Sequence, residues 1–306
     1  MTRGLYQGYR RILFNTQVDD MFLSTGLYEP AGSEYRVNVA SMEAHANWVG
    51  PLNARLPAGS NYFIELAYNG NGDIIEATSI DNSGVCDPDE AIYYPGQVDP
   101  PLEFQKPLGT GVDIWPETPD NYTWSEQCAE LDPLMTWTQS ILGSGDFSHM
   151  SHTFSHMNLN NATYDDAYKE IQFNQDWMAQ TGIAGAPRYS ANGLVPPAIT
   201  GLNNGDVLRA WSDLGLTSVV GDNTRPPLRN QQSEHWPLFT TVAEDGFAGF
   251  QITPRWATTI FFNCDLPQCT TNEWIATSGG AGDFDDLLED AKRVNLRHLF
   301  GLLHDP

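Results

Sequence analysis

The sequence has no run of about 18 consecutive apolar residues, so nothing in it predicts a helix that spans a membrane. Basic side chains are also scarce: 15 Lys and Arg stand against 39 Asp and Glu, which gives a formal net charge of -24. A surface of that sign repels nucleic-acid phosphates and anionic lipids, so we expect neither as a partner. It suits a cationic polymer, although acidity is equally common as a trait that keeps proteins in solution.

Cysteine is scarce as well. The four cysteines are Cys86, Cys128, Cys264 and Cys269, and none forms a CxxC pair, which argues against a zinc knuckle or a thioredoxin-type site. An even number suits two disulfides. Four cysteines allow three pairings, and proximity favours Cys264–Cys269 as a local clip and Cys86–Cys128 across a long loop.

Two glycosylation sequons, Asn121-Tyr122-Thr123 and Asn161-Ala162-Thr163, agree with disulfides in predicting a secreted glycoprotein of the extracellular space or cell wall. No apolar signal region follows Met1, and the other end is equally abrupt at Pro306. We therefore expect residues 1–306 to form a single domain, cut from a longer multidomain protein, and to be monomeric.

Two common catalytic signatures are missing. Zinc proteases carry Glu directly after the first His of a paired-histidine motif, whereas here Thr153 follows His152. No glycine fingerprint for phosphate is present either, and Asn69-Gly70-Asn71-Gly72 predicts a turn.

Strand-like and helix-like patterns alternate along the chain. The expected strands are 11–18, 62–68, 147–151, 188–190, 217–220 and 258–262, and the expected helices begin near Ser41, Leu134, Thr163, Asp206 and Asp283. This order predicts parallel strands with helices packed outside them, as a distorted (β/α) barrel. An open doubly wound sheet is the alternative. Residues 70–130 are rich in proline and interrupt the alternation of strand and helix patterns, which predicts a long irregular insertion.

The most informative stretch is 148–156, which contains three of the seven histidines. His152 and His156 are four residues apart, so one helical turn would direct both imidazoles to the same side. Two imidazoles are half of a catalytic metal site that still needs a carboxylate and a water. Such a pair alone is more often structural. If 147–152 is extended, His149 points away from His152, and we exclude it as a ligand.

Polar residues follow the ends of several expected strands: Asp19-Asp20, the histidine pair, Asp222 and His304. In a parallel barrel these ends share one face, and that face carries the chemistry. The sequence therefore predicts a metal site at the mouth of the barrel.

The same residues resemble the motifs of NodB-type polysaccharide deacetylases. Val18-Asp19-Asp20 is similar to their first motif, His152-Thr153-Phe154-Ser155-His156 to their second, and Leu302-Leu303-His304 to their last. Arg188-Tyr189-Ser190 and Val220-Gly221-Asp222-Asn223 lie where the third and fourth motifs belong, but both depart from the usual pattern. Two longer segments, 156–164 and 219–226, most resemble the fungal galactosaminogalactan deacetylases of carbohydrate esterase family 18.

The resemblance implies roles for these residues. Asp20, His152 and His156 would hold a divalent cation, with zinc the expected metal. Asp19 would be the general base and His304 the acid that protonates the departing amine. A backbone N–H near Tyr189 to Ala191 would stabilise the oxyanion.

Each supporting residue has an alternative reading. Asp222 could hydrogen-bond His304 or only form a turn. Arg188 could pair with Asp19 or lie on the surface. The Asp19-Asp20 pair could be a helix cap or turn. Ser190 is expected beside the site. Four aromatic residues in loops are candidates for a sugar platform or for core packing: Trp115, Trp124, Tyr189 and Trp256.

The expected function is metal-dependent N-deacetylation of N-acetylgalactosamine units in galactosaminogalactan, an exopolysaccharide of fungal biofilms. The substrate would thus be a polysaccharide rich in N-acetylhexosamine. A chitin-type deacetylase or an O-acetyl esterase on the same scaffold is the nearest alternative. A non-catalytic carbohydrate-binding domain is the alternative from another class.

Overall fold

A computed structural model describes residues 15–86, 91–94, 105–116, 120–256 and 261–291. Contacts along the chain divide it into two compact units. The larger unit comprises 17–25 and 34–257, and the smaller one comprises the remaining residues.

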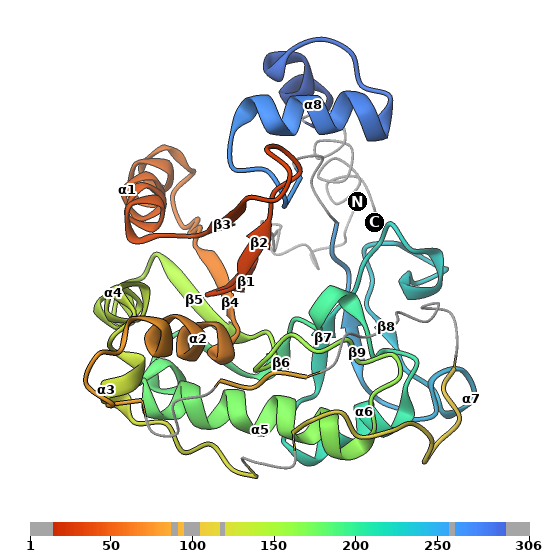
Figure 1. Cartoon of the computed structure of the whole chain (residues 1–306). Helices are drawn as coiled ribbons and strands as arrows, with labels where there is room; N and C mark the ends of the chain where they lie inside the picture. The colour runs from red at the N-terminus through yellow and green to blue at the C-terminus, as the bar shows by residue number, and fades with distance from the viewer. Residues whose placement is uncertain (1–14, 87–90, 95–104, 117–119, 257–260, 292–306) are drawn as a thin grey trace. The chain divides into compact units, whose positions relative to one another are not determined.

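A seven-stranded sheet forms the centre of the larger unit and curls into a half-barrel (Figure 1). Its strands, in spatial order, are β1 (Thr16–Met21), β4 (Ile64–Tyr68), β5 (Phe147–Ser151), β6 (Tyr189–Leu194), β7 (Ser218–Val220), β9 (Gln251–Thr253) and β8 (Leu238–Phe239). The pairs from β4 through to β9 are parallel, and β8 is antiparallel to β9. The expected distorted barrel is therefore confirmed as a curled sheet with two edges in the described part of the chain. A separate two-stranded sheet joins β2 (Ser24–Gly26) to β3 (Glu34–Arg36).

Figure 1 shows α2, α5 and α6 along the outer side of these strands. The α-helices of this unit are α1 (Val39–Arg55), α2 (Gly70–Ile80), α3 (Glu126–Ala129), α4 (Pro133–Ile141), α5 (Tyr164–Gln180), α6 (Gly205–Asp213) and α7 (Val242–Asp245). Short 3-10 turns occupy η1 (Ile183–Gly185), η2 (Pro197–Ile199) and η3 (Pro226–Leu228).

Side chains cap the starts of several helices, among them α1 and α5. Thr163 accepts a hydrogen bond from the Asp166 amide at the start of α5, as the sequence predicted. The cap of α1 was expected at Ser41 but lies at Asn38, whose side chain accepts from the Ser41 amide. Helix α1 continues through Pro51 to Arg55.

The start of α2 corrects two sequence predictions. Residues 69–72 are not a turn: Asn69 occupies the N-cap position, without a side-chain cap, of a helix that begins at Gly70. The irregular segment is correspondingly shorter than 70–130, since helix α2 extends to Ile80 and α3 and α4 begin at Glu126 and Pro133. The glycine is required for packing, because a Cβ on Gly70 would lie 2.7 Å from the Trp177 ring.

The expected strand at 258–262 lies partly outside the described residues, and residues 261–262 are not part of a strand. The sequence missed β8 and β9, which contain two and three residues and show no readable alternation. Both expected disulfides are confirmed, Cys86–Cys128 and Cys264–Cys269.

In the smaller unit, the Cys264–Cys269 disulfide ties the first turn of α8 (Pro267–Ser278) to the segment before it. A further helix runs through 284–291, and the Asp283 side chain accepts from the amides of Asp285 and Asp286, as expected of its cap. Among the described helices, none is long and apolar enough to cross a membrane.

Candidate metal centre and active site

One carboxylate and two imidazoles from distant segments meet at the carboxyl ends of the strands. Asp20 Oδ1 lies 3.1 Å from Nε2 of His152 and 3.1 Å from Nε2 of His156. One donor atom from each of the three residues falls within 4.8 Å of the others. The grouping predicted from the sequence is therefore present.

The two Asp20–His distances, 3.1 Å each, fit a divalent cation. Zinc binds His nitrogen and carboxylate oxygen at about 2.0–2.2 Å, so ligands around one ion lie roughly 3 to 3.5 Å apart. His152 Nδ1 is 2.7 Å from the carbonyl oxygen of Val195. If Nδ1 carries the proton and donates it to that oxygen, the lone pair of Nε2 is available to bind a cation. His152 is buried, whereas Asp20 and His156 keep about a third of their side-chain surface exposed, at 34% and 30%. The arrangement offers three protein ligands and an open side toward solvent.

The electrostatics of the group match its role as a cation site. Burial alone would raise the pKa of Asp20, but contacts with His152 and His156 outweigh burial and hold that pKa below its ordinary value. For His156, burial favours the neutral ring, yet the Asp20 carboxylate raises its pKa. A bound cation needs the neutral imidazole, so metal binding here releases protons and strengthens as pH rises.

The two histidines do not lie on a helical turn, which corrects the sequence interpretation. Residues 152–163 contain no helix, and Thr153 and His156 both have positive φ, 66° and 63°. Asp20 also has positive φ, 56°. Left-handed backbone is strained for the β-branched Thr153 and persists there only where surrounding contacts impose it, so the metal loop, defined here as residues 152–156, is held by its neighbours.

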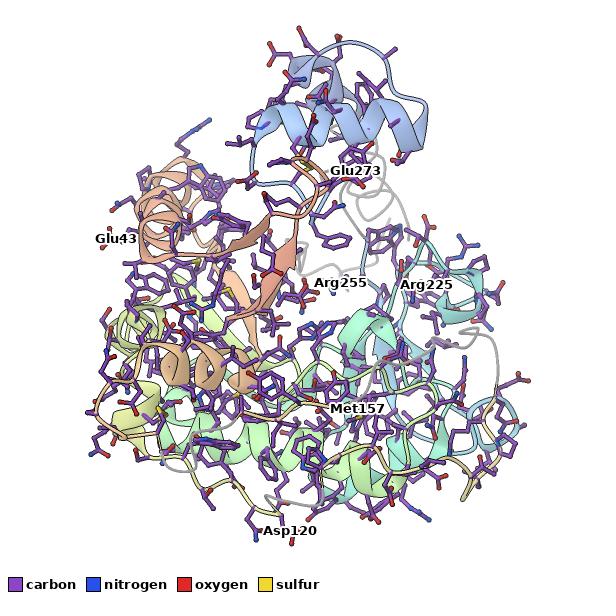
Figure 2. All side chains as sticks on the ribbon, viewed as in Figure 1. Glu43, Asp120, Met157, Arg225, Arg255 and Glu273 are labelled. Atoms are coloured by element: carbon purple, nitrogen blue, oxygen red, sulfur yellow. A yellow bond between two sulfur atoms is a disulfide. The ribbon has the colours of Figure 1, made fainter. Side chains whose placement is uncertain are left out.

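Those neighbours satisfy the backbone of the metal loop. The side-chain Nδ2 of Asn69, the residue after β4, donates to the carbonyl oxygens of His152 and Thr153 at 2.6 and 3.0 Å. The Phe154 ring packs among buried aromatic side chains, with ring centroids 5.5 Å from Phe173 and 6.0 Å from Trp124. Met157, labelled in Figure 2, follows the loop and is fully buried. The metal loop is thus held by hydrogen bonds to its backbone and by the burial of the Phe154 and Met157 side chains.

The partner of Asp19 is Arg255. Its Nη2 lies 2.6 Å from Asp19 Oδ2, while Arg188, considered for this role from the sequence, places its guanidinium 4.3 Å from the Phe63 ring centre. Arg255 follows β9 and is labelled in Figure 2. No sequence signal pointed to it, because β9 has no readable pattern and is far from Asp19 along the chain.

In the segment that matches the third motif, the Tyr189 amide and the Ser190 hydroxyl already have hydrogen-bond partners within the protein. The Tyr189 amide donates to the Ala186 carbonyl at 3.1 Å, so it is not free to bind an oxyanion. Ser190 Oγ is 3.4 Å from Oε1 of the buried Glu65. Of the expected oxyanion donors, only the amides after Tyr189 are left as candidates.

Asp222 forms a turn. Its carboxylate accepts from the Thr224 amide at 2.9 Å and pairs with Arg225 at 3.0 Å. Its expected contact with His304 cannot be placed, since His304 lies outside the described residues.

Two of the four candidate platform aromatics belong to the core. Trp115 and Trp124 are 6% and 1% exposed and pack around Phe154 and Phe173. Their loops carry them inward because a large apolar cluster forms beneath the metal loop. Trp256 is half-buried against His235, with ring centroids 5.3 Å apart.

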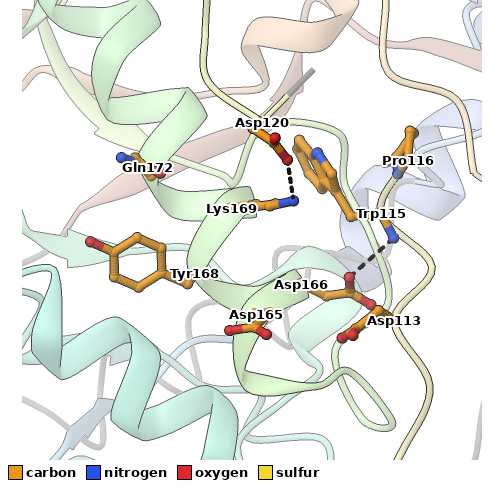
Figure 3. A pocket seen from close by; sticks show the side chains of 9 residues that line it. All are labelled: Asp113, Trp115, Pro116, Asp120, Asp165, Asp166, Tyr168, Lys169 and Gln172. Atoms are coloured by element: carbon orange, nitrogen blue, oxygen red, sulfur yellow. Dashed lines mark hydrogen bonds and ion pairs between the residues drawn. The ribbon is translucent and has the colours of Figure 1, made fainter. Parts of the chain in front are cut away.

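A pocket of about 490 Å³ lies at the start of α5, away from the metal ligands (Figure 3). Its lining is acidic, but most of the charges are already engaged. Asp166 accepts from the Trp115 amide, Asp120 pairs with Lys169 at 3.5 Å, and Asp113 accepts from Thr163. This pocket contributes no residue to the cluster of Asp20, His152 and His156.

A family model described as the Agd3 deacetylase domain matches residues 14–306. The solved structure titled as Agd3, a novel carbohydrate deacetylase, is similar at 53% identity and a TM-score of 0.93 over 99% of this chain. The chain covers 46% of that protein, less than half its length. A 4-alpha-glucanotransferase from Thermococcus litoralis is matched at 17% identity over 46% of this chain and 22% of its own, and its TM-score of 0.32 carries no argument. No curated protein sequence matches.

Proposed function

Because this chain belongs to the family of Agd3 deacetylase domains, we propose that it removes acetyl groups from N-acetylated sugars of an extracellular polysaccharide. The proposal rests on the convergence of Asp20, His152 and His156 into one set of donor atoms. These three residues would hold the cation, and zinc is the metal that their donor types favour. When bound, the cation supplies Lewis acidity, which activates water and polarises a carbonyl group.

Asp19 is the general base of the proposed reaction. Its Oδ2 accepts a hydrogen bond from Arg255, which leaves Oδ1 to take the proton of the attacking water. The water oxygen adds to the acetyl carbon, the C–N bond breaks, and the nitrogen takes up a proton. Acetate and a free amine are the products. Arg255 keeps the carboxylate turned toward the water.

Two further roles come from the motif resemblance. His304 would give the departing nitrogen its proton, which matters because an amide nitrogen leaves poorly without one. The amide of Ser190 or Ala191 would stabilise the oxyanion, since the Tyr189 amide is engaged.

We propose galactosaminogalactan as the polymer, on the basis of the same resemblance. Each deacetylation converts a neutral sugar into a cation, which a chain of formal charge -24 attracts. The half-buried rings of Tyr189 and Trp256 are the candidates for stacking on sugar faces. Two disulfides and two sequons support secretion.

The test is acetate release from an N-acetylgalactosamine polymer, measured together with the appearance of primary amines. We expect turnover to stop on chelation, to return with zinc, and to fall by roughly 100-fold or more in Asp19→Asn. Asp165→Asn, an acidic residue beside the far pocket, is the control and should turn over normally. Chitin oligomers and O-acetylated xylan, assayed in parallel, distinguish the chitin-type and esterase alternatives. Acetate release that is unchanged after complete chelation would refute metal dependence.

A further inference from the structure

Helix α5 carries a stripe of buried polar side chains along one side. Asp166, Glu170 and Asn174 are spaced four residues apart, so they lie on one side of the helix. All three are buried, at 1%, 0% and 0% exposed. Charged side chains are rarely buried unless they bind something specific, so each member should have a partner.

Each residue of the stripe holds a different segment. Asp166 accepts from the amides of Ile114 and Trp115. The Asn174 side chain donates to the carbonyl oxygen of Tyr68 at 2.9 Å, at the end of β4. Glu170 lies between them and holds the metal loop.

Both carboxylate oxygens of Glu170 accept hydrogen bonds from the same residue of the metal loop, Ser155. Its Oε2 accepts from the Ser155 amide at 3.0 Å, and its Oε1 accepts from the Ser155 hydroxyl. The Ser155 carbonyl oxygen accepts from the Tyr94 hydroxyl at 3.1 Å, and the Phe154 amide donates to the backbone carbonyl of Glu170 at 2.9 Å. Both residues between Thr153 and His156 are therefore tied to α5.

We propose that Glu170 is a positioning residue that sets the cation affinity of the site by holding the metal loop in its ligating conformation; the inference rests on the proposed function. His156 has φ of 63° and follows Ser155 directly. Because the clamp at Ser155 fixes the backbone directly before His156, its loss would let the ring move away from the position in which Nε2 lies 3.1 Å from Asp20 Oδ1. Glu170 does not contact the reacting atoms, so its effect passes through the loop.

The stripe supplies its own matched control. Asp166 lies one turn earlier on the same helix and is similarly buried, and its two oxygens also each accept one hydrogen bond from another segment, here the amides of Ile114 and Trp115 (Figure 3). Glu170→Gln and Asp166→Asn each replace one carboxylate oxygen by an amide group that cannot accept from a backbone N–H. A general loss of stability should therefore be similar in the two variants, whereas a loss of cation affinity should be specific to Glu170→Gln.

The experiment measures the dissociation constant for zinc alone, by competition with a chromophoric chelator, on the whole chain. We expect Glu170→Gln to bind zinc about 10- to 100-fold more weakly than the unmodified chain. Asp166→Asn should bind it within about threefold. Acetate release by Glu170→Gln should recover at saturating zinc, because the clamp acts on the loop and not on the chemical step.

If circular dichroism shows that Glu170→Gln does not fold, Ser155→Ala serves as the test variant. It removes the hydrogen bond from the Ser155 hydroxyl to Glu170 and keeps the one from the Ser155 amide. It should weaken zinc binding by several-fold. Zinc affinity that is equal in a folded Glu170→Gln variant and the unmodified chain overturns the clamp while leaving the proposed function intact. Absence of zinc binding by the unmodified chain overturns both.

Discussion

Arg255 Nη2 lies 2.6 Å from Asp19 Oδ2, although 236 positions separate the two residues in the chain. Asp19 belongs to β1, at one edge of the seven-stranded sheet, and Arg255 follows β9, the sixth strand in spatial order. A flat sheet would keep these strands far apart, since neighbouring strands are about 4.8 Å from each other. The ion pair is therefore made possible by the curl of the sheet, and it spans the mouth of the half-barrel.

This relationship predicts the behaviour of an Arg255→Gln variant. The Asp19 carboxylate loses the group that orients it, so kcat should fall by on the order of 10- to 100-fold, the scale expected for a misplaced catalytic group. Zinc affinity should stay unchanged, because Arg255 contacts no metal ligand. Steady-state kinetics and zinc competition measure the two quantities. Arg188→Gln should leave kcat close to normal, and a larger loss there than in Arg255→Gln would restore the pairing that the sequence suggested.

A second prediction concerns acid stability and His149. The ring is fully buried, with Nδ1 2.8 Å from the Tyr68 hydroxyl, and burial lowers its pKa from 6.5 to about 4. Below pH 6.5 the unfolded chain therefore binds a proton that the folded chain does not. The free energy of unfolding should fall as pH decreases from 6.5 toward 4, by about 3 kcal/mol from this group.

Urea unfolding across this pH range tests the assignment. His149→Asn keeps a short polar group facing Tyr68 and has no titrating ring. It should be less stable at pH 7, because ring packing is lost, and its stability should depend less steeply on pH between 6.5 and 4. Parallel curves for the two proteins would show that another group is responsible.

The two disulfides should contribute unequally. Cys86–Cys128 closes a separation of 42 residues and Cys264–Cys269 one of 5. The loss of chain entropy in the unfolded state predicts about 4 kcal/mol for the first and about 2 kcal/mol for the second. Urea unfolding of the two double Cys→Ser variants provides the comparison. An equal or reversed order would mean that native contacts, and not loop closure, determine their effect.

The three candidate metal ligands could be predicted from the sequence because they lie at or just after the ends of strands with a readable pattern. The physical reason given for the histidine pair was nevertheless wrong. A spacing of four suggested a helical turn, whereas the structure brings His152 and His156 together through a loop with positive φ at Thr153 and His156. Spacing alone does not distinguish these geometries, since the loop conformation is imposed by contacts from β4 and α5.

Other residues of the site left weaker signals or none. Asn69 and Gly70 suggested a turn, but tertiary packing against Trp177 makes them the start of α2. The polar spacing of Glu170 and Asn174 was visible on α5 but could equally mark a solvated face. Arg255 had no local signal at all, because its role depends on a three-residue strand and on sheet curvature.

The most direct test of the account is anomalous diffraction from crystals of this chain grown with zinc, collected on both sides of the zinc absorption edge. We predict one strong peak about 2.0–2.2 Å from Asp20 Oδ1 and from Nε2 of His152 and His156, the distances of zinc coordination. A chain that binds zinc elsewhere and leaves these three residues without a peak would contradict the proposed mechanism.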